Sequence, residues 1–290
     1  MAGLRYEAPN TVDAAIGLLS EVDGAKVLAG GTDLLVQMRE EMIDPDLIVD
    51  IKRINETRRI EITSDYVKIG AAMTGAELCE NEELAAMWPG VVEAVELIGS
   101  WQVQGRATIG GNLCNASPAA DSVPAIIASG AKIVVAGPEG VREIPAEKFP
   151  QAPGRTALGA NEFVVSLVLP VPPKRSGDAY LRFIPRTEMD IAVVGAGVSL
   201  SLNEDGTCAT ARVALGAVAP TALLVHDAMD VLVGSKLDEG TLEKLDKAAR
   251  EACNPIDDKR GTIEYRTKVA GVLVRRTAAI AWERAQKQNG

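Results

Sequence analysis

The sequence predicts an α+β protein built from two consecutive domains. Short apolar strand patterns alternate with helical patterns through the first half of the chain, whereas longer alternating strands and two helical patterns fill the last third. Between them lies the segment 170–177, whose prolines oppose both a helix and a central strand. The chain has 290 residues, 47% of them hydrophobic, so each part can bury a core of its own. We therefore expect domains at residues 1–172 and 177–288.

The first domain is expected to consist of two lobes, residues 1–55 and 56–172. The first lobe alternates helical spacing with short apolar runs, which is typical of a small α+β unit. Its expected elements are a helix over 11–20, a strand over 26–29, a helix over 32–39 and a strand over 47–50.

The second lobe is expected to combine hairpins with helices. Ser64 and Asp65 form a turn between two strand patterns, and Thr74 and Glu77 have the spacing of a capping box. The segment 137–140, Gly-Pro-Glu-Gly, predicts a second hairpin turn. The expected strands are 60–63, 66–69, 132–136 and 141–144, and the expected helices run from Thr74 to about Gly99 and over 121–129.

The C-terminal domain is expected to be a three-stranded antiparallel sheet covered by helices. An Asp-Gly turn at 203–206 joins two of its strands. The segment 193–197 resembles the start of a Rossmann fingerprint, but Leu200 stands at the third glycine position and the strand pattern continues, which excludes a nicotinamide site. The expected strands are 180–184, 192–202 and 207–215, and the expected helices are 237–252 and 262–286.

Composition excludes several classes of function. The net charge of −10 argues against nucleic acid, which basic surfaces bind. The sequence has no signal-like start and no apolar run of roughly 18 residues, so we expect a cytoplasmic protein without membrane insertion. Its four cysteines are scattered without a C-x-x-C pair, and the single His226 has no acid and nucleophile beside it. We therefore expect no metal bound by this chain.

Two glycine pairs are the strongest functional signal. Gly30 and Gly31 follow a short strand and precede a helical pattern, which predicts Thr32 near the helix N-cap with free amides facing outward. Gly110 and Gly111 lie in a segment rich in amides and hydroxyls. Glycine lets backbone N–H groups approach a phosphate closely, at positive φ, so two such segments predict one dinucleotide.

The segments 29–35 (AGGTDLL) and 108–122 (TIGGNLCNASPAADS) together resemble the FAD-binding subunits of the molybdenum hydroxylases, the family of xanthine dehydrogenase and carbon monoxide dehydrogenase. The resemblance extends over nearly the whole chain and includes the segment 189–192 (MDIA). It implies a two-lobed FAD-binding domain of the PCMH/VAO type, followed by a C-terminal domain like that of the CO dehydrogenase flavoprotein.

The resemblance also implies which residues bind FAD. The two glycine segments would hold the diphosphate, and Asp121 would accept hydrogen bonds from FAD hydroxyl or amide groups. Ile98 and Val164 would touch a ring system, and Arg182 takes the place of a usual basic residue. The implied binding residues are Leu28, Ala29, Gly30, Gly31, Thr32, Asp33, Leu34, Ile98, Thr108, Ile109, Gly110, Gly111, Asn112, Asp121, Val164 and Arg182. A valine at Gly110 or Gly111 is expected to weaken FAD binding while the fold survives.

The implied function is electron transfer by non-covalently bound FAD, with no catalytic side chain. Electrons would come from [2Fe-2S] clusters on a small partner subunit and leave to an external acceptor, while a large partner would carry the molybdenum cofactor. The assembly would be a dimer of heterotrimers. The chain departs from the family pattern at 104–107, Gln-Gly-Arg-Ala, where relatives usually have Arg-Asn. Two alternatives remain open: a self-contained FAD-dependent reductase of the same superfamily, and a non-catalytic nucleotide-binding or assembly subunit.

Overall fold

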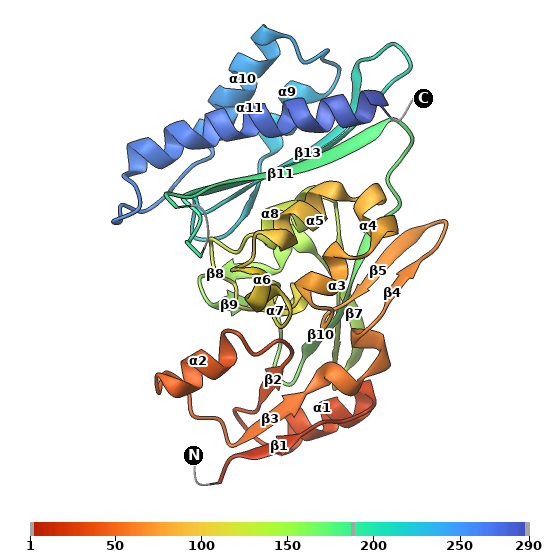
Figure 1. Cartoon of the computed structure of the whole chain (residues 1–290), viewed down its shortest axis with the longest axis vertical. Helices are drawn as coiled ribbons and strands as arrows, with labels where there is room; N and C mark the ends of the chain where they lie inside the picture. Colours follow the sequence, from red (N-terminus) through yellow and green to blue (C-terminus); the bar gives the residue numbers. More distant parts are fainter. Residues whose placement is uncertain (1–2, 187–188, 288–290) are drawn as a thin grey trace.

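Three parts follow one another along the long axis of the molecule (Figure 1). The computed structural model describes residues 3–186 and 189–287; the outermost ends of the two expected domains, residues 1–2 and 288, lie outside the described residues. Lobe 1 (residues 3–55) carries the N-terminus, lobe 2 (56–172) lies in the middle, and the C-terminal part (176–287) covers the far end of lobe 2.

Lobe 1 contains a three-stranded parallel sheet with strand order β1-β3-β2. All residues of its central strand β3 are buried, as expected for a strand with neighbours on both edges. Helix α2 begins two residues later than predicted, and its N-cap residue is Asp33, so Thr32 lies next to the N-cap as expected. The Asp33 side chain makes no capping hydrogen bond to the helix; its carboxylate accepts a hydrogen bond from Asn115 of lobe 2 at 3.3 Å. The elements are β1 (Arg5–Glu7), α1 (Val12–Glu21), β2 (Lys26–Leu28), α2 (Leu34–Arg39), β3 (Leu47–Asp50) and the 3-10 helices η1 (Ile51–Arg53) and η2 (Asn55–Thr57).

Lobe 2 is built on a five-stranded antiparallel sheet with strand order β4-β5-β10-β6-β7. The capping box at Thr74 and Glu77 is confirmed at the start of α3. The strands are β4 (Ile60–Ile62), β5 (Tyr66–Gly70), β6 (Lys132–Gly137), β7 (Gly140–Pro145) and β10 (Phe163–Pro170), with a small hairpin of β8 (Pro150–Ala152) and β9 (Arg155–Thr156). The helices are α3 (Gly75–Cys79), α4 (Glu82–Met87), α5 (Pro89–Glu96), α6 (Trp101–Gln104), α7 (Ile109–Cys114), α8 (Ser122–Ala128) and η3 (Ala146–Lys148).

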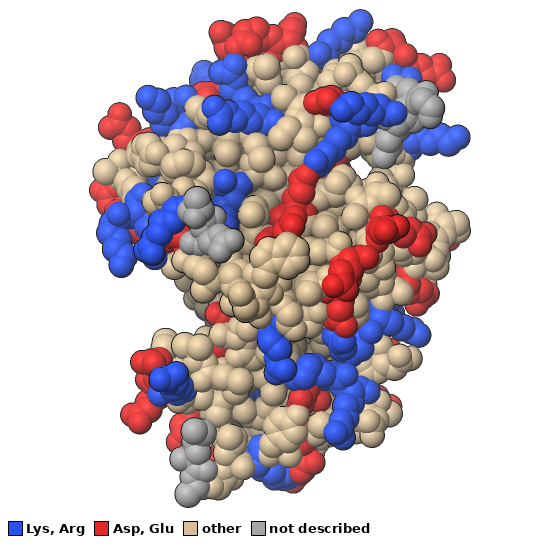
Figure 2. Space-filling view, in the orientation of Figure 1, with Lys and Arg blue, Asp and Glu red and all other residues tan. Residues whose placement is uncertain are grey.

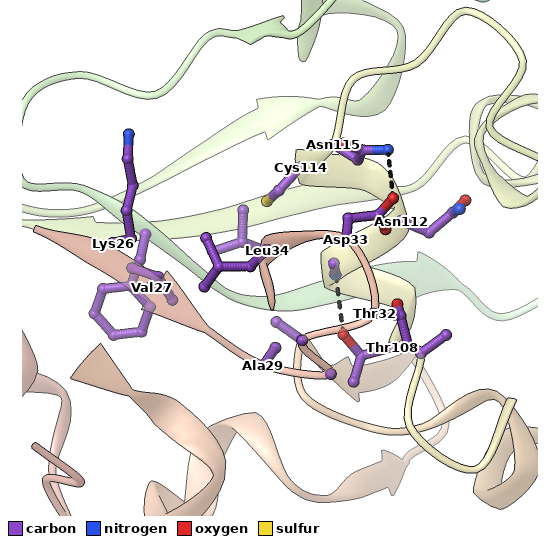
Figure 3. Close-up of a pocket in the computed structure, with 18 of the residues that line it drawn as sticks. Lys26, Val27, Ala29, Thr32, Asp33, Leu34, Thr108, Asn112, Cys114 and Asn115 are labelled. Atoms are coloured by element: carbon purple, nitrogen blue, oxygen red, sulfur yellow. Dashed lines mark hydrogen bonds between the residues drawn. The ribbon is translucent and has the colours of Figure 1, made fainter. Parts of the chain in front are cut away.

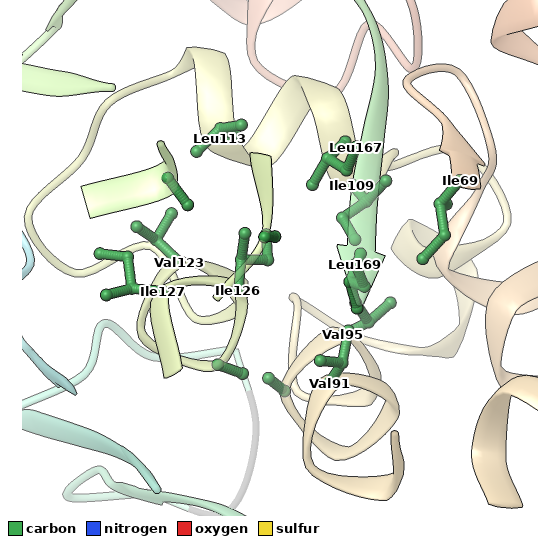
Figure 4. Packing of buried hydrophobic residues seen from close by; sticks show 14 of the residues in the cluster. Ile69, Val91, Val95, Ile109, Leu113, Val123, Ile126, Ile127, Leu167 and Leu169 are labelled. Carbon is green, nitrogen blue, oxygen red and sulfur yellow. The ribbon is translucent and has the colours of Figure 1, made fainter. Parts of the chain in front are cut away.

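The two faces of strand β10 belong to different cores. Leu167 and Leu169 belong to the main core of lobe 2, together with apolar residues of helices α5, α7 and α8 (Figure 4). Phe163 and Val165 belong to the core of lobe 1. Strand β10 therefore contributes to the cores of both lobes.

The C-terminal part has a four-stranded antiparallel sheet, whereas three strands were predicted. The extra strand has only two residues, too few to show an alternating pattern. Strand β11 begins at Ser176, inside the segment predicted as a linker. It approaches helix α11 so closely that a Cβ on Gly177 would lie 2.2 Å from the carbonyl oxygen of Ala281. The elements are β11 (Ser176–Phe183), β12 (Val194–Leu202), β13 (Cys208–Gly216), β14 (Leu223–Leu224), α9 (His226–Leu232), α10 (Glu239–Glu251) and α11 (Ile263–Lys287).

Charged side chains of both signs are scattered over the visible face of the molecule (Figure 2). Within the described residues, no helix is both long and apolar enough to cross a membrane. The longest, α11, packs along β11 and β12 and buries one face against them.

Ionisable groups connect lobe 2 to the C-terminal part. Glu93 of α5 pairs with Arg284 of α11 and accepts a hydrogen bond from the backbone N–H of Tyr180 at 3.1 Å. Arg284 also donates to the backbone oxygen of Asp178 at 2.7 Å. The Asp178 side chain is buried there, and its desolvation, together with the nearby Glu93 charge, raises its pKa to about 7 despite the opposing Arg284.

Replacing Asp178 by asparagine is expected to remove a pH-dependent contribution to stability. The folded-state pKa lies above the ordinary carboxyl value of 3.8, so the folded protein holds the proton more tightly than the unfolded chain. Asp178 therefore favours folding most in acid, and this advantage is lost as the pH rises towards 7. Between about pH 4 and pH 7, the melting temperature of wild type should fall relative to that of Asp178→Asn as the pH rises. A difference in melting temperature that stays the same across this pH range would contradict the raised pKa of the Asp178 carboxyl.

Candidate functional site

A pocket of about 380 Å³ lies between the two lobes. Lobe 1 contributes the end of β2, the loop 29–33 and α2, while lobe 2 contributes α7 and the start of β10 (Figure 3). In the space-filling view the surface is hollowed between lobe 1 and the rest of the molecule (Figure 2). Both glycine segments therefore meet at one site, as the sequence predicts.

The first glycine segment presents unpaired backbone amides to this pocket. Gly31 has φ +82°, a left-handed conformation that favours glycine. Gly30 packs so tightly that a Cβ would lie 2.2 Å from the carbonyl oxygen of Arg106. Within the described part of the chain, the N–H groups of residues 30–33 donate to no protein acceptor. Gly30 is buried, Gly31 and Thr32 are half-buried, and Asp33 is exposed. Consecutive free amides of this kind beside a pocket suit an anion.

The second glycine segment is a wall of the pocket instead of a second amide cradle, which corrects the prediction. Its residues form α7, and neither Gly110 nor Gly111 has a positive φ. The N–H of Gly110 donates to the Ala71 oxygen at 3.1 Å, and the N–H of Gly111 donates to Thr108 Oγ1 at 3.0 Å (Figure 3). The amide of Ile109 is also occupied, by the Met73 oxygen at 3.3 Å. These amides are therefore not free for phosphate.

Polar side chains tie the two segments together. Asn115 Nδ2 donates to Asp33 Oδ1 at 3.3 Å across the pocket (Figure 3). Partial burial raises the pKa of Asp33 above the ordinary value. Asn112 Oδ1 accepts a hydrogen bond from Ser122 Oγ at 2.7 Å, which fixes the amide and leaves its Nδ2 as a donor. The site therefore offers neutral donors on both of its sides.

Most of the predicted binding residues line the pocket. Leu28 and Ile109 are buried and do not line it. The predicted residues that do line it are Ala29, Gly30, Gly31, Thr32, Asp33, Leu34, Ile98, Thr108, Gly110, Gly111, Asn112 and Val164.

Asp121 and Arg182 form a buried ion pair outside the pocket lining. Arg182 Nη1 lies 2.9 Å from Asp121 Oδ2 and donates to the Leu97 oxygen at 2.8 Å, so the pair adjoins the pocket residue Ile98 from behind. Burial raises the pKa of Asp121 to about 6, against the opposing effects of Arg182 and Tyr180. Its Oδ1 is buried and accepts no hydrogen bond within the described residues. Contact of Asp121 with a ligand stays a prediction.

Several lining residues were not predicted. Asn115 lies one turn after Gly111 on the same face of α7, so helical spacing could have identified it. Cys114 also lines the pocket, and burial raises the pKa of its thiol to about 12, which leaves it protonated at neutral pH. Some of the remaining residues adjoin predicted ones in the sequence, namely Lys26, Val27, Ala107 and Phe163. The others carry no local signal: Gln37, Ile43, Ile51, Ala71, Gly154, Leu158 and Glu162.

Comparison with known proteins identifies the family. Residues 2–172 match the family described as the FAD binding domain in molybdopterin dehydrogenase, and residues 179–281 match the CO dehydrogenase flavoprotein C-terminal domain. The chain belongs to the FAD-binding subunits of the molybdenum hydroxylases. It is 36% identical to the carbon monoxide dehydrogenase medium chain of Afipia carboxidovorans over 97% of both chains. It is 31% identical to the putative xanthine dehydrogenase FAD-binding subunit of Escherichia coli K12 over 95% of both.

Solved structures of this family superpose closely on the chain. A chain of the Cu,Mo-CO dehydrogenase in its cyanide-inactivated form matches with a TM-score of 0.93 and 35% identity, covering 97% of this chain and 98% of that one. Quinoline 2-oxidoreductase from Pseudomonas putida gives a TM-score of 0.90 at 28% identity with the same coverage. The chain is therefore a subunit of an oxidoreductase complex with an FAD-binding domain.

The pocket fits FAD on observations of its own. The free amides at 30–33 suit a diphosphate, and the apolar residues Ile98 and Val164 suit a flat ring system. Among the described residues no group of three or more His, Cys, Asp or Glu side chains is placed to hold a metal ion. The residues of this pocket are therefore compatible with a flavin nucleotide held by neutral donors.

Proposed function

We propose that this chain carries electrons through FAD within a molybdenum hydroxylase complex. Electrons would come from iron–sulfur clusters on a small partner subunit and leave to an external acceptor. The observation that supports this is the row of unpaired amides at 30–33, which lies beside the pocket between the two lobes. The proposed binding domain spans residues 1–172 and the C-terminal domain 177–288.

The residues of this chain bind and orient the cofactor. The loop 29–33 would hold the diphosphate through its amides, while α7 would support the opposite side through Thr108 and Asn112. Ile98 and Val164 would contact a ring system, and Asp121 with Arg182 would fix the wall behind Ile98. When bound, FAD supplies the exchange between single-electron and paired-electron transfer. Cys114 stays a thiol and takes no part.

The proposed partners follow from the relatives. The carbon monoxide dehydrogenase relative is named a medium chain, and one solved relative is a Cu,Mo enzyme. We propose a small iron–sulfur subunit and a large subunit with the molybdenum cofactor, assembled as a dimer of heterotrimers. The substrate would then be selected on the large subunit, which would carry the molybdenum cofactor.

The visible spectrum of the purified chain tests the binding of FAD. We expect flavin absorption without iron absorption, and a stoichiometric gain of flavin when the stripped protein is mixed with FAD. The isolated chain should oxidise NADH slowly at most. A colourless protein that takes up no FAD would instead support a non-catalytic nucleotide-binding or assembly subunit.

Acid precipitation should release the flavin into solution. The described pocket contains no histidine, and the thiol of Cys114 is held in its unreactive protonated form by burial. We therefore expect non-covalent binding. Flavin absorption that stays with the precipitated protein after washing would contradict this expectation.

A further inference from the structure

The loop with free amides is held from behind by a lysine. Lys52 Nζ donates to the carbonyl oxygen of Ala29 at 2.9 Å and lies 2.8 Å from Asp50 Oδ2. Asp50 is buried, with 5% of its surface exposed, and also accepts hydrogen bonds from the Tyr6 hydroxyl at 2.5 Å and the Lys52 backbone N–H at 2.9 Å. These contacts lower the pKa of Asp50 against the effect of burial, so the carboxylate is ionised and Lys52 has a fixed partner.

The acceptor of Lys52 belongs to the first peptide of the amide cradle. The oxygen of Ala29 and the N–H of Gly30 are parts of one planar trans peptide, in which they point in opposite directions. Because the oxygen is turned towards Lys52, the N–H of Gly30 is turned away from it. Gly30 is buried and lines the pocket, and its N–H donates to no acceptor within the described residues. The position of Lys52 thus fixes the direction of a free donor.

The positive charge of Lys52 also strengthens that donor. A cation on the carbonyl oxygen polarises the peptide and makes its N–H a better donor to an anion. Lys26 is the one cationic side chain among the described residues that line the pocket, so the site has little other positive charge for a diphosphate. An indirect contribution from Lys52 is therefore significant.

We propose that Lys52 is a positioning residue for the diphosphate of FAD. It acts through the Ala29–Gly30 peptide, and the buried Asp50 and Tyr6 hold it in place. The inference rests on the binding of FAD in this pocket. It deepens the proposed function by assigning a role to a residue that neither lines the pocket nor belongs to a glycine segment.

The test measures FAD affinity and apoprotein stability on the same variants of the full chain. Lys52→Met removes the charge and the donor but leaves the Asp50 carboxylate buried without its ion-pair partner, which can destabilise the fold. The double variant Asp50→Asn/Lys52→Met removes both charges and avoids that cost. Lys52→Arg keeps a charged donor. Lys132→Met is the matched control, because Lys132 pairs with Glu143 on the exposed edge of lobe 2.

Flavin fluorescence during titration of each stripped protein with FAD gives the dissociation constant. We expect the double variant to bind FAD about ten-fold more weakly or worse, which is the loss expected for a charge-assisted hydrogen bond, while its melting temperature stays near wild type. Lys52→Arg should recover most of the affinity, and Lys132→Met should equal wild type. A double variant that binds FAD as tightly as wild type would overturn the proposal. If wild type itself binds no FAD, the proposed function fails as well.

Discussion

Gly110→Ala should destabilise the fold, whereas Gly111→Ala should fold normally and lose affinity for FAD. A Cβ on Gly110 would lie 2.5 Å from the Ala71 oxygen and 2.6 Å from the Ala71 Cβ, both in a closely packed core. Backbone atoms there cannot move without displacing β5 and α7, so we expect a loss of about 3 kcal/mol or more in unfolding free energy. Valine at Gly110 should lower the unfolding free energy further, because its side chain is larger. The sequence-based expectation that the fold survives substitution at Gly110 is therefore withdrawn.

Gly111 is the matched control, one residue along the same helix. A Cβ there would meet only Thr108 Oγ1, at 2.8 Å, and would otherwise face the pocket. Alanine favours a helix over glycine, which offsets the disturbance of the Thr108 cap. Chemical denaturation and FAD titration on both variants separate the two roles. Equal stability of the two variants would show that Gly110 does not pack against Ala71 as described.

Asp121→Ala should also cause a large loss of stability. The Arg182 side chain is 4% exposed and would keep only its hydrogen bond to the Leu97 oxygen, so a buried charge would lose its partner. Breaking a buried pair from one side typically costs about 3–5 kcal/mol. The double variant Asp121→Ala/Arg182→Met removes both charges and should recover most of that loss. The measurement is urea denaturation at neutral pH, where Asp121, with a pKa of about 6, is ionised.

A single variant as stable as wild type would contradict the described ion pair. FAD affinity of the double variant then tests the separate prediction that Asp121 contacts the cofactor. If the double variant is stable and binds FAD normally, Asp121 serves only to stabilise the wall behind Ile98.

Local sequence signals predicted the elements that depend on neighbouring residues. The capping box at Thr74 and Glu77 and the turn at 203–206 involve residues within one turn of each other, and both form as expected. The two-residue strand β14 and the helix α9 were missed, because short elements are stabilised by their contacts with β13 and not by their own pattern.

The site was predicted in its location but not in the roles of its two glycine segments. The two motifs predicted that both segments meet at one pocket. The residues that decide the role of each segment, however, are distant from it in sequence. Ala71 leaves no room for a Cβ on Gly110, and the Gly110 N–H donates its hydrogen bond to the oxygen of the same residue. Asp121, at the start of α8, meets Arg182 of β11, and Lys52 meets Ala29 across lobe 1. Such contacts depend on the tertiary fold and leave no periodic pattern in the sequence.

The central claim is that this chain is the FAD-carrying subunit of a molybdenum hydroxylase complex. Affinity purification of a tagged copy from its native host, followed by flavin, iron and molybdenum analysis of the eluted complex, tests it most directly. We predict that a small iron–sulfur subunit and a large molybdenum subunit elute with the chain, each in equal amount, and that FAD is bound to this chain alone. A metal-free homo-oligomer that turns over an organic substrate at full rate would contradict the claim and support a self-contained flavin reductase.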